Sequence, residues 1–191
     1  MGKLTVFNQV TLDGYFAGAH GDISWAHNGK QDAEWNAFVE NNAKGGGVLL
    51  FGRITYELMA AYWPTPQALR NDPVVAERMN SLPKIVFSRT LAQVSWSHAR
   101  LVKGDMASEV RRMKEAPGED MAILGSCSLV AQLAPLGLID EYQIVVNPVV
   151  LGGGRTLFDG VKAALELKLI KTRTFANGKV LLCYEKDLKD S

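Results

Sequence analysis

Apolar residues along this chain gather in short runs that glycine and polar clusters separate. The run Val48-Leu49-Leu50-Phe51 is continuous, and similar runs cover 84–88 and 121–124. A short continuous apolar run is typical of a strand buried on both faces, as in a parallel sheet. These three runs therefore predict strands buried on both faces, and residues 99–102 predict a further strand.

Partial alternation of apolar and polar residues marks the two ends of the chain. Residues 3–10, rich in Val, Thr and Phe, predict a first strand, and 140–150 predict a long β-rich strand. Two further strands are expected at 164–175 and 179–186. The Asn177-Gly178 pair between them is favoured in tight hairpins, so the two strands should be antiparallel.

Helical patterns fill most of the gaps between these strands. Asp72-Pro73 is a good helix start, with Asp as N-cap and Pro in the first position. Residues 17–30 predict a long loop instead, and long loops in compact domains are often functional. The helices are expected at 31–43, 54–61, 73–81, 106–115 with Asp105 as cap, and 128–136.

The order of elements predicts the fold class. Strand–helix units repeat before two or three strands follow one another, which favours a mostly parallel sheet. We expect an α/β three-layer sandwich, with helices on both faces of the central sheet and an antiparallel C-terminal hairpin. Residues 1–191 should form a single domain, because this length is ordinary for one domain.

Composition narrows the classes of partner. The net charge of +1 does not favour nucleic acid or an anionic membrane. No apolar run reaches the length of a membrane span, and the first residues lack the pattern of a signal peptide. Cys127 and Cys183 are expected to be reduced and mostly buried, which agrees with a cytoplasmic location. His20, His27 and His98 are too scattered to predict a metal site.

Three strand ends share one kind of sequence. They are Gly52-Arg53-Ile54-Thr55, Ser88-Arg89-Thr90 and Gly125-Ser126-Cys127-Ser128. Ligands of open α/β sheets bind at the carboxyl ends of the strands, where helix N-termini and arginines favour phosphate. Each of these strand ends, called corners below, could by itself be an ordinary turn, with its arginine solvated where it has one. Three corners on one sheet edge favour a site for a ligand with several phosphates.

The common phosphate motifs are absent. The chain has no Gly-x-Gly-x-x-Gly after a strand and no Gly-x-x-x-x-Gly-Lys-Ser/Thr. An ordinary Rossmann dinucleotide site and a P-loop are therefore not supported.

A series of five motifs, spread over nearly the whole chain, carries a family resemblance. They are Thr11-Leu-Asp-Gly-Tyr, Leu50-Phe-Gly-Arg-Ile-Thr-Tyr-Glu, Val86-Phe-Ser-Arg, Ile123-Leu-Gly-Ser and Pro148-Val-Val-Leu-Gly-Gly-Gly-Arg-Thr-Leu-Phe. In this order they resemble the dihydrofolate-reductase-like superfamily, most closely the reductase domain of the bifunctional riboflavin-biosynthesis deaminase-reductase. The chain lacks the His-x-Glu and Pro-Cys-x-x-Cys motifs of the deaminase half.

The resemblance implies NADPH as cofactor and a homodimer, for which the apolar strand 142–151 beside the terminal hairpin could supply the surface. It also implies positions for the cofactor's groups. Gly52, Arg53 and Thr55 would hold phosphates, and Ser88 and Arg89 would flank the 2′-phosphate of the adenosine. The residues expected at the pyrophosphate and the nicotinamide side are Gly125, Ser126, Cys127 and Ser128.

The substrate side is less sharply marked. Asp13 is the candidate proton donor, although an aspartate before Gly14 also suits a plain turn. Asp32 and Glu34 lie where dihydrofolate reductases place a substrate-binding carboxylate. Arg155 could bind an anionic substrate. Trp25 could stack on a planar heterocycle, and Trp35 likewise, although packing roles suit both.

The resemblance, together with these residues, implies an NADPH-dependent reductase of the dihydrofolate reductase or 5-amino-6-(5-phosphoribosylamino)uracil reductase type. Its substrate would be a small pteridine- or pyrimidine-like heterocycle that could carry a ribosyl phosphate. A non-catalytic nucleotide-binding protein that retains the pocket is the alternative. A third reading is an interaction scaffold, which would bind no dinucleotide.

Overall fold

The computed structural model of the 191-residue chain describes residues 2–27, 32–45 and 47–187. Positions 28–31, where the expected long loop ends and the expected first helix begins, lie outside these ranges. The same holds for Gly46 of the glycine turn and for the C-terminal residues 188–191. Among the helices in the described ranges, none combines the length and the apolarity that crossing a membrane requires.

Within the described residues, the central sheet has eight strands in the order β5-β4-β3-β6-β1-β7-β10-β9. β10 runs antiparallel to both β7 and β9, and every other neighbouring pair is parallel. The expected mostly parallel sheet with an antiparallel C-terminal hairpin is confirmed. The strands are β1 Leu4–Thr11, β3 Val48–Gly52, β4 Lys84–Phe87, β5 Ala99–Val102, β6 Met121–Leu124, β7 Glu141–Asn147, β9 Leu167–Thr174 and β10 Val180–Lys186.

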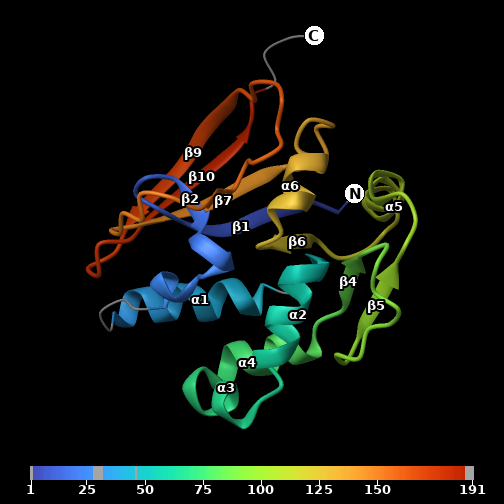
Figure 1. Cartoon of the computed structure of the whole chain (residues 1–191), viewed down its shortest axis with the longest axis horizontal. Coiled ribbons are helices and arrows are strands. Elements are labelled where there is room, and N and C mark those ends of the chain that lie inside the picture. The colour runs from blue at the N-terminus through green and yellow to red at the C-terminus, as the bar shows by residue number, and fades with distance from the viewer. Residues whose placement is uncertain (1, 28–31, 46, 188–191) are drawn as a thin grey trace.

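Helices cover both faces of this sheet, as expected (Figure 1). One face carries α1, α2 and α4, with the short α3 packed beside α4. The other face carries α5 and α6. Their bounds are α1 Ala33–Lys44, α2 Arg53–Tyr62, α3 Pro66–Asn71, α4 Pro73–Ser81, α5 Met106–Glu115 and α6 Cys127–Leu133.

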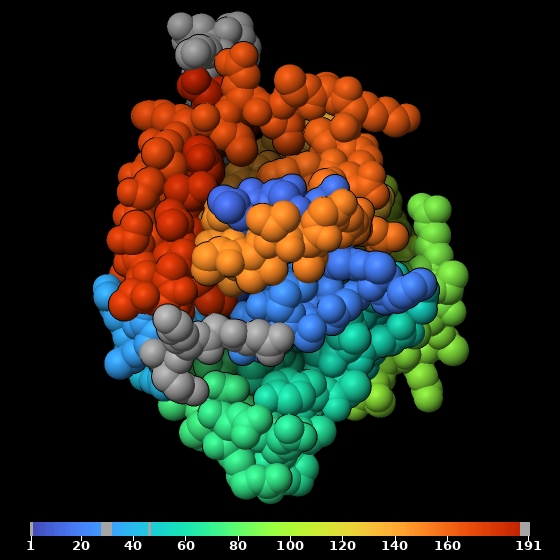
Figure 2. Space-filling model, turned by 60° about the vertical axis from the view of Figure 1, so that its left-hand side comes forward, coloured from blue at the N-terminus to red at the C-terminus, as the bar shows by residue number. Residues whose placement is uncertain are grey.

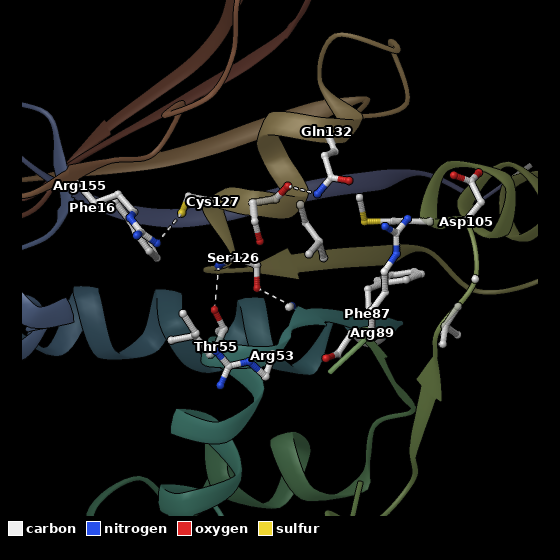
Figure 3. Close-up of a pocket in the computed structure, with 18 residues that line it drawn as sticks. Phe16, Arg53, Thr55, Phe87, Arg89, Asp105, Ser126, Cys127, Gln132 and Arg155 are labelled. Atoms are coloured by element: carbon white, nitrogen blue, oxygen red, sulfur yellow. Dashed lines mark hydrogen bonds between the residues drawn. The ribbon is translucent and has the colours of Figure 1, made fainter. Parts of the chain in front are cut away.

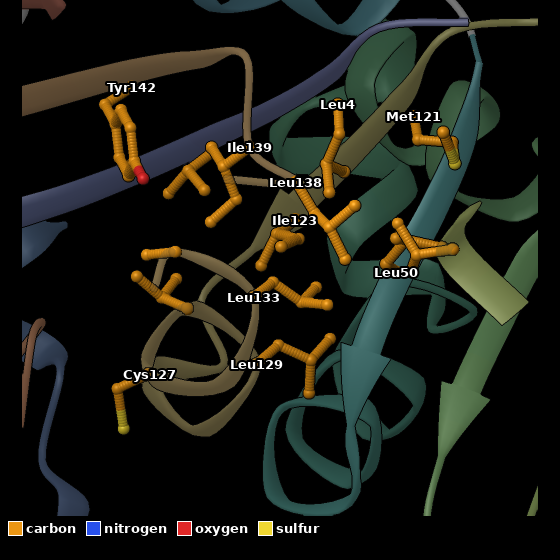
Figure 4. Close-up of a cluster of buried hydrophobic side chains, with 14 of the residues drawn as sticks. Leu4, Leu50, Met121, Ile123, Cys127, Leu129, Leu133, Leu138, Ile139 and Tyr142 are labelled. Carbon is orange, nitrogen blue, oxygen red and sulfur yellow. The ribbon is translucent and has the colours of Figure 1, made fainter. Parts of the chain in front are cut away.

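Strand β3 shows why the apolar runs carry no alternation. Leu50 faces the core under α5 and α6, whereas Leu49 and Phe51 face the core under α2 and α4. Because successive strand residues point to opposite faces, a strand covered on both sides needs apolar residues throughout. Figure 4 shows Leu129 and Leu133 of α6 directed toward Leu50 and Ile123 in the first of these cores.

Local signals place several helix starts. The Asp105 carboxylate accepts a hydrogen bond of 2.7 Å from the Ser108 N–H, as an N-cap should. Helix α4 begins at Pro73 as expected, but the Asp72 side chain makes no capping hydrogen bond. Helix α3 was not predicted, although the Thr65 hydroxyl caps it and Pro66 opens it.

Some predicted bounds are corrected at their ends. Strand β7 stops at Asn147 rather than at 150, because Pro148 has no N–H to continue the ladder. The first hairpin strand starts at Leu167 rather than at 164. Helix α6 ends at Leu133 rather than at 136, and Gly137 then turns the chain.

Residues 15–27, which include the described part of the loop expected at 17–30, contain more structure than the sequence predicted. Tyr15–Ala17 forms β2, which pairs antiparallel with Arg155–Thr156 of β8. Two short 3-10 turns follow, at Ala19–Gly21 and Ser24–Ala26. The space-filling view in Figure 2 shows the orange segment around residue 155 against the blue N-terminal segment. This two-stranded ribbon carries Phe16 and Arg155 to the site.

Candidate functional site

Four parallel strands end side by side and form one wall of a cavity. Gly52, Phe87 and Val102 are paired in register at the ends of β3, β4 and β5, and β6 ends beside β3 at Leu124. The residues after these strands line a cavity of about 450 Å³, a volume typical of ligand pockets. Of the nine residues expected to bind the cofactor, all except Gly125 line it: Gly52, Arg53, Thr55, Ser88, Arg89, Ser126, Cys127 and Ser128.

Hydrogen bonds between the strand ends hold the floor of this cavity. The Gly52 N–H donates to the Ser126 hydroxyl at 2.8 Å, and the Ser126 N–H donates to the Thr55 hydroxyl at 3.0 Å (Figure 3). Buried Asn8 of β1 accepts the Gly125 N–H at 2.7 Å. The corners after β3 and β6 are thus tied to each other and to β1, which fixes their shape before any ligand arrives.

The three arginines of the cavity differ in their surroundings. Arg53 lies 3.1 Å from Glu57, one helical turn along α2, with both side chains nearly half exposed. Arg89 follows β4 and has no ion pair within the described residues. The Arg155 guanidinium reaches Cys127, with 3.9 Å between Nη1 and Sγ. In Figure 3, Arg155 lies near one end of the cavity, Arg89 near the other, and Arg53 between them.

Sequence reasoning missed a fourth corner and the walls of the cavity. Gly104, Asp105 and Met106 follow β5 and line the same end as Arg89. A strand-end test applied to 99–102 would have found this corner. Other lining residues are the ribbon residue Phe16, the last residues of β4 and β5, and two residues of α6, and they were not selected from the sequence: Phe16, Phe87, Val102, Leu129 and Gln132.

The predicted substrate residues on and before the first helix do not line the cavity. The buried Asp32 carboxylate caps α1, accepting the N–H groups of Glu34 and Trp35, and its second oxygen accepts the Asn177 N–H. These bonds, that from Trp35 foremost, lower the pKa of Asp32. Glu34 instead pairs with Arg173 at 2.6 Å on the surface. The structure therefore gives both carboxylates structural partners, and a substrate role for either stays a prediction.

Trp25 is buried with its Nε1–H unpartnered among the described residues. Beside it, the ammonium of buried Lys179 donates to Ala26 O and Gln9 Oε1, and lies 4.6 Å from the Trp35 ring. This polar cluster sits at the carboxyl end of β1, outside the cavity. Stacking of Trp25 or Trp35 on a substrate stays a prediction, and for Trp35 the observed packing also includes Phe38 and Phe175.

Asp13 braces two loops. Its carboxylate accepts the Thr11 hydroxyl at 2.6 Å and the N–H groups of Leu151 and Gly152, the latter at 2.7 Å. These bonds, that from Thr11 foremost, lower the pKa of Asp13. A carboxylate held ionised is a poor proton donor at neutral pH. Proton donation by Asp13 stays a prediction. In the structure, the Asp13 carboxylate holds the loop at 151–152, which leads to Arg155.

The described residues contain no group of three or more His, Cys, Asp or Glu side chains placed to hold a metal ion. Cys127 and Cys183 are both free thiols and both buried. The chemistry that this site offers is cationic and hydrogen-bonding: three guanidinium groups, several hydroxyls and backbone N–H groups.

The chain matches the family described as the RibD C-terminal domain over residues 2–181. It is 33% identical over 175 residues to the uncharacterized protein YyaP of Bacillus subtilis (strain 168). That match covers 92% of this chain and 90% of the relative.

Two solved structures share the fold. One is the Thermotoga maritima diaminohydroxyphosphoribosylaminopyrimidine deaminase/5-amino-6-(5-phosphoribosylamino)uracil reductase, with a TM-score of 0.68 and 15% identity. That match covers 97% of this chain and 56% of the larger one. The other is the dihydrofolate reductase of Enterococcus faecalis complexed with NADP(H) and RAB-propyl, with a TM-score of 0.65 and 13% identity over 97% of each chain.

Proposed function

Because the chain belongs to the RibD C-terminal domain family, we propose that it is an NADPH-dependent reductase of a small heterocycle. The substrate would be pteridine- or pyrimidine-like, with or without a ribosyl phosphate. The observation that carries the proposal is that eight of the nine expected cofactor residues, all except Gly125, line one cavity. The fold, shared with a uracil reductase and a dihydrofolate reductase, supports it.

The donor set of the cavity fits a phosphorylated dinucleotide. NADPH carries a pyrophosphate and a 2′-phosphate, and guanidinium groups pair with phosphate through two parallel hydrogen bonds. Arg89 and Ser88 would hold the 2′-phosphate. The pyrophosphate would lie among Arg53, Thr55 and the corner at 125–128. When bound, the cofactor supplies a hydride.

The protein's own part is to bind and orient. The hydrogen bonds among Gly52, Thr55, Ser126 and Asn8 fix the phosphate corners in advance, so little ordering remains on binding. The β2–β8 ribbon places Phe16 and Arg155 beside Cys127, at the end of the cavity nearest β1. Arg155 there would face either the pyrophosphate or an anionic group of the substrate.

A titration followed by tryptophan fluorescence tests the cofactor. We expect NADPH to bind in the micromolar range and NADH to bind more weakly. Arg89→Ala should weaken NADPH binding by about 1–3 kcal/mol, or about 5- to 150-fold, because a charged contact to phosphate is lost. Arg53→Ala should cost less, since Glu57 already pairs with that guanidinium. Arg70→Ala, an exposed arginine of α3 away from the cavity, is the matched control.

The outcomes separate the readings. Binding followed by NADPH oxidation with a pterin, pyrimidine or flavin precursor would support the reductase. Binding without oxidation by any of them would favour the non-catalytic nucleotide-binding alternative. Equal NADPH affinity in all four proteins, or no binding of either dinucleotide, would contradict the proposed site.

We also propose that the chain forms a homodimer through the hairpin end of the sheet. On the α6 side of β7 and β10, four apolar side chains in cross-strand pairs are only half buried: Ile144 with Leu182, and Val146 with Val180. Half-buried apolar pairs on an open sheet face suit a self-complementary interface. Light scattering should give twice the mass of one chain, and Leu182→Glu should reduce it to the mass of one chain. A wild-type mass of one chain would contradict the dimer.

A further inference from the structure

An acidic residue lies where the proposed 2′-phosphate would bind. Strands β4 and β5 are paired with Phe87 opposite Val102, so Arg89 and Asp105 leave neighbouring strands two and three residues later. Both side chains line the same end of the cavity (Figure 3). The corner therefore offers a cation and an anion to one part of a ligand.

The two charges suit two different cofactors. In dinucleotide sites, a carboxylate accepts the ribose 2′-hydroxyl of NADH, whereas an arginine accommodates the 2′-phosphate of NADPH. We propose that Arg89 and Asp105 together set the choice between the two cofactors, and that the chain binds both NADPH and NADH. This inference rests on the proposed function, since it assigns a role within the proposed cofactor site.

The Asp105 carboxylate is accessible and charged in the folded protein, as a contact with the ribose requires. The side chain is exposed. Its hydrogen bonds with Ser108, and to a smaller extent the nearby charges of Arg111 and Arg89, lower the pKa of Asp105, so the carboxylate is ionised at neutral pH. A carboxylate has about four acceptor positions, so capping α5 leaves capacity for a ribose hydroxyl. Toward a phosphate with two negative charges, the same carboxylate is repulsive at a distance within the Debye length.

A pair of substitutions isolates the charge. Asp105→Asn keeps the shape and the helix cap, since Asn is as good an N-cap as Asp. Glu115→Gln is the matched control, because it removes one negative charge from the other end of the same helix, outside the cavity. Thermal denaturation of each variant verifies that the fold is kept, and Asp105→Ser serves as a second cap-preserving variant.

Dissociation constants for NADPH and NADH are then measured for each protein. For the wild type we expect the two to lie within about tenfold of each other. Asp105→Asn should tighten NADPH about three- to tenfold and weaken NADH about two- to fivefold, whereas Glu115→Gln should change neither. Arg89→Ala should weaken NADPH and leave NADH within about twofold.

The failures are distinguishable. If the wild type binds NADPH but Asp105→Asn and Asp105→Ser leave the NADPH/NADH ratio within about twofold, the role of Asp105 is overturned and the proposed function stands. A wild-type preference for NADPH far above tenfold also overturns the inference. If neither dinucleotide binds to the wild type, the proposed function falls and this inference falls with it.

Discussion

Gly154→Ala is expected to weaken NADPH binding about a hundredfold, or about 2.7 kcal/mol. Gly154 has φ of +145°, and a Cβ there would lie 2.2 Å from the carbonyl oxygen of Ala17. That oxygen is backbone of β2, the partner of β8, so it cannot yield without breaking the ribbon. Breaking the ribbon removes Phe16 and Arg155 from the cavity together. Strain of this kind also costs about 1–3 kcal/mol of stability.

The glycine triplet contains its own controls. A Cβ on Gly153 meets nothing within 4 Å and the residue has no positive φ, so Gly153→Ala should bind NADPH like the wild type. Gly152 has φ of +70° with open space around it, so its alanine variant isolates the conformational strain, about 1–2 kcal/mol. Titration and thermal denaturation of the three variants measure the series. Equal effects at 152 and 154 would mean that the contact with Ala17 does not matter.

The local sequence predicts the long strands and most helices of this fold. Val48-Leu49-Leu50-Phe51 predicts a strand covered on both faces because each of its side chains needs an apolar partner, and the structure supplies one on each side. Asp105 marks the start of α5 because its carboxylate accepts a hydrogen bond from the Ser108 N–H within the first turn. Pro73 marks the start of α4 because a residue in the first helical position needs no N–H for the helix. Elements of this kind depend on their own residues, which explains why their predicted positions were confirmed.

The β2–β8 ribbon could not be predicted in the same way. Residues 15–17 pair with 155–156 across about 140 positions of the chain, and two or three residues are too few to show periodicity. The glycine triplet indicated only a turn or an anion contact. Its observed role, letting two backbones approach at Gly154, depends on a tertiary contact that no local pattern records.

For the site, sequence reasoning selected strand ends that meet at one cavity, whereas the isolated carboxylates that it selected lie outside that cavity. The corners at 52–55, 88–89 and 125–128 follow from topology, because the ends of parallel strands meet at one edge, and all of their residues except Gly125 line one cavity. Asp13 and Asp32 were singled out by position alone. The Asp13 carboxylate accepts hydrogen bonds from the N–H groups of Leu151 and Gly152. The Asp32 carboxylate accepts them from Glu34 and Trp35. These partners were not predicted from the sequence.

Gly125→Ala should lower the free energy of unfolding by about 3–4 kcal/mol and abolish measurable NADPH binding. The residue has φ of +65°, and its Cβ would lie 2.9 Å from Thr55 Cγ2 and 3.2 Å from Thr55 Oγ1. Moving Thr55 breaks the hydrogen bond that its hydroxyl accepts from Ser126, whose own hydroxyl holds the Gly52 N–H. One added methyl group therefore disturbs both phosphate corners.

Gly137 provides a matched control, because it has the same φ of +65° but a Cβ there would meet only the flexible end of Lys186. Gly137→Ala should therefore cost only the strain of the left-handed conformation, about 1–2 kcal/mol. Thr55→Ser removes Cγ2 and keeps the hydroxyl, so combining it with Gly125→Ala should recover about half of the lost stability. Denaturant unfolding of the wild type, Gly125→Ala, Thr55→Ser and the double variant gives the coupling energy between positions 125 and 55, and Gly137→Ala is measured beside them. If Gly125→Ala costs no more than Gly137→Ala, or if Thr55→Ser recovers nothing, the contact between Gly125 and Thr55 does not hold the two corners together.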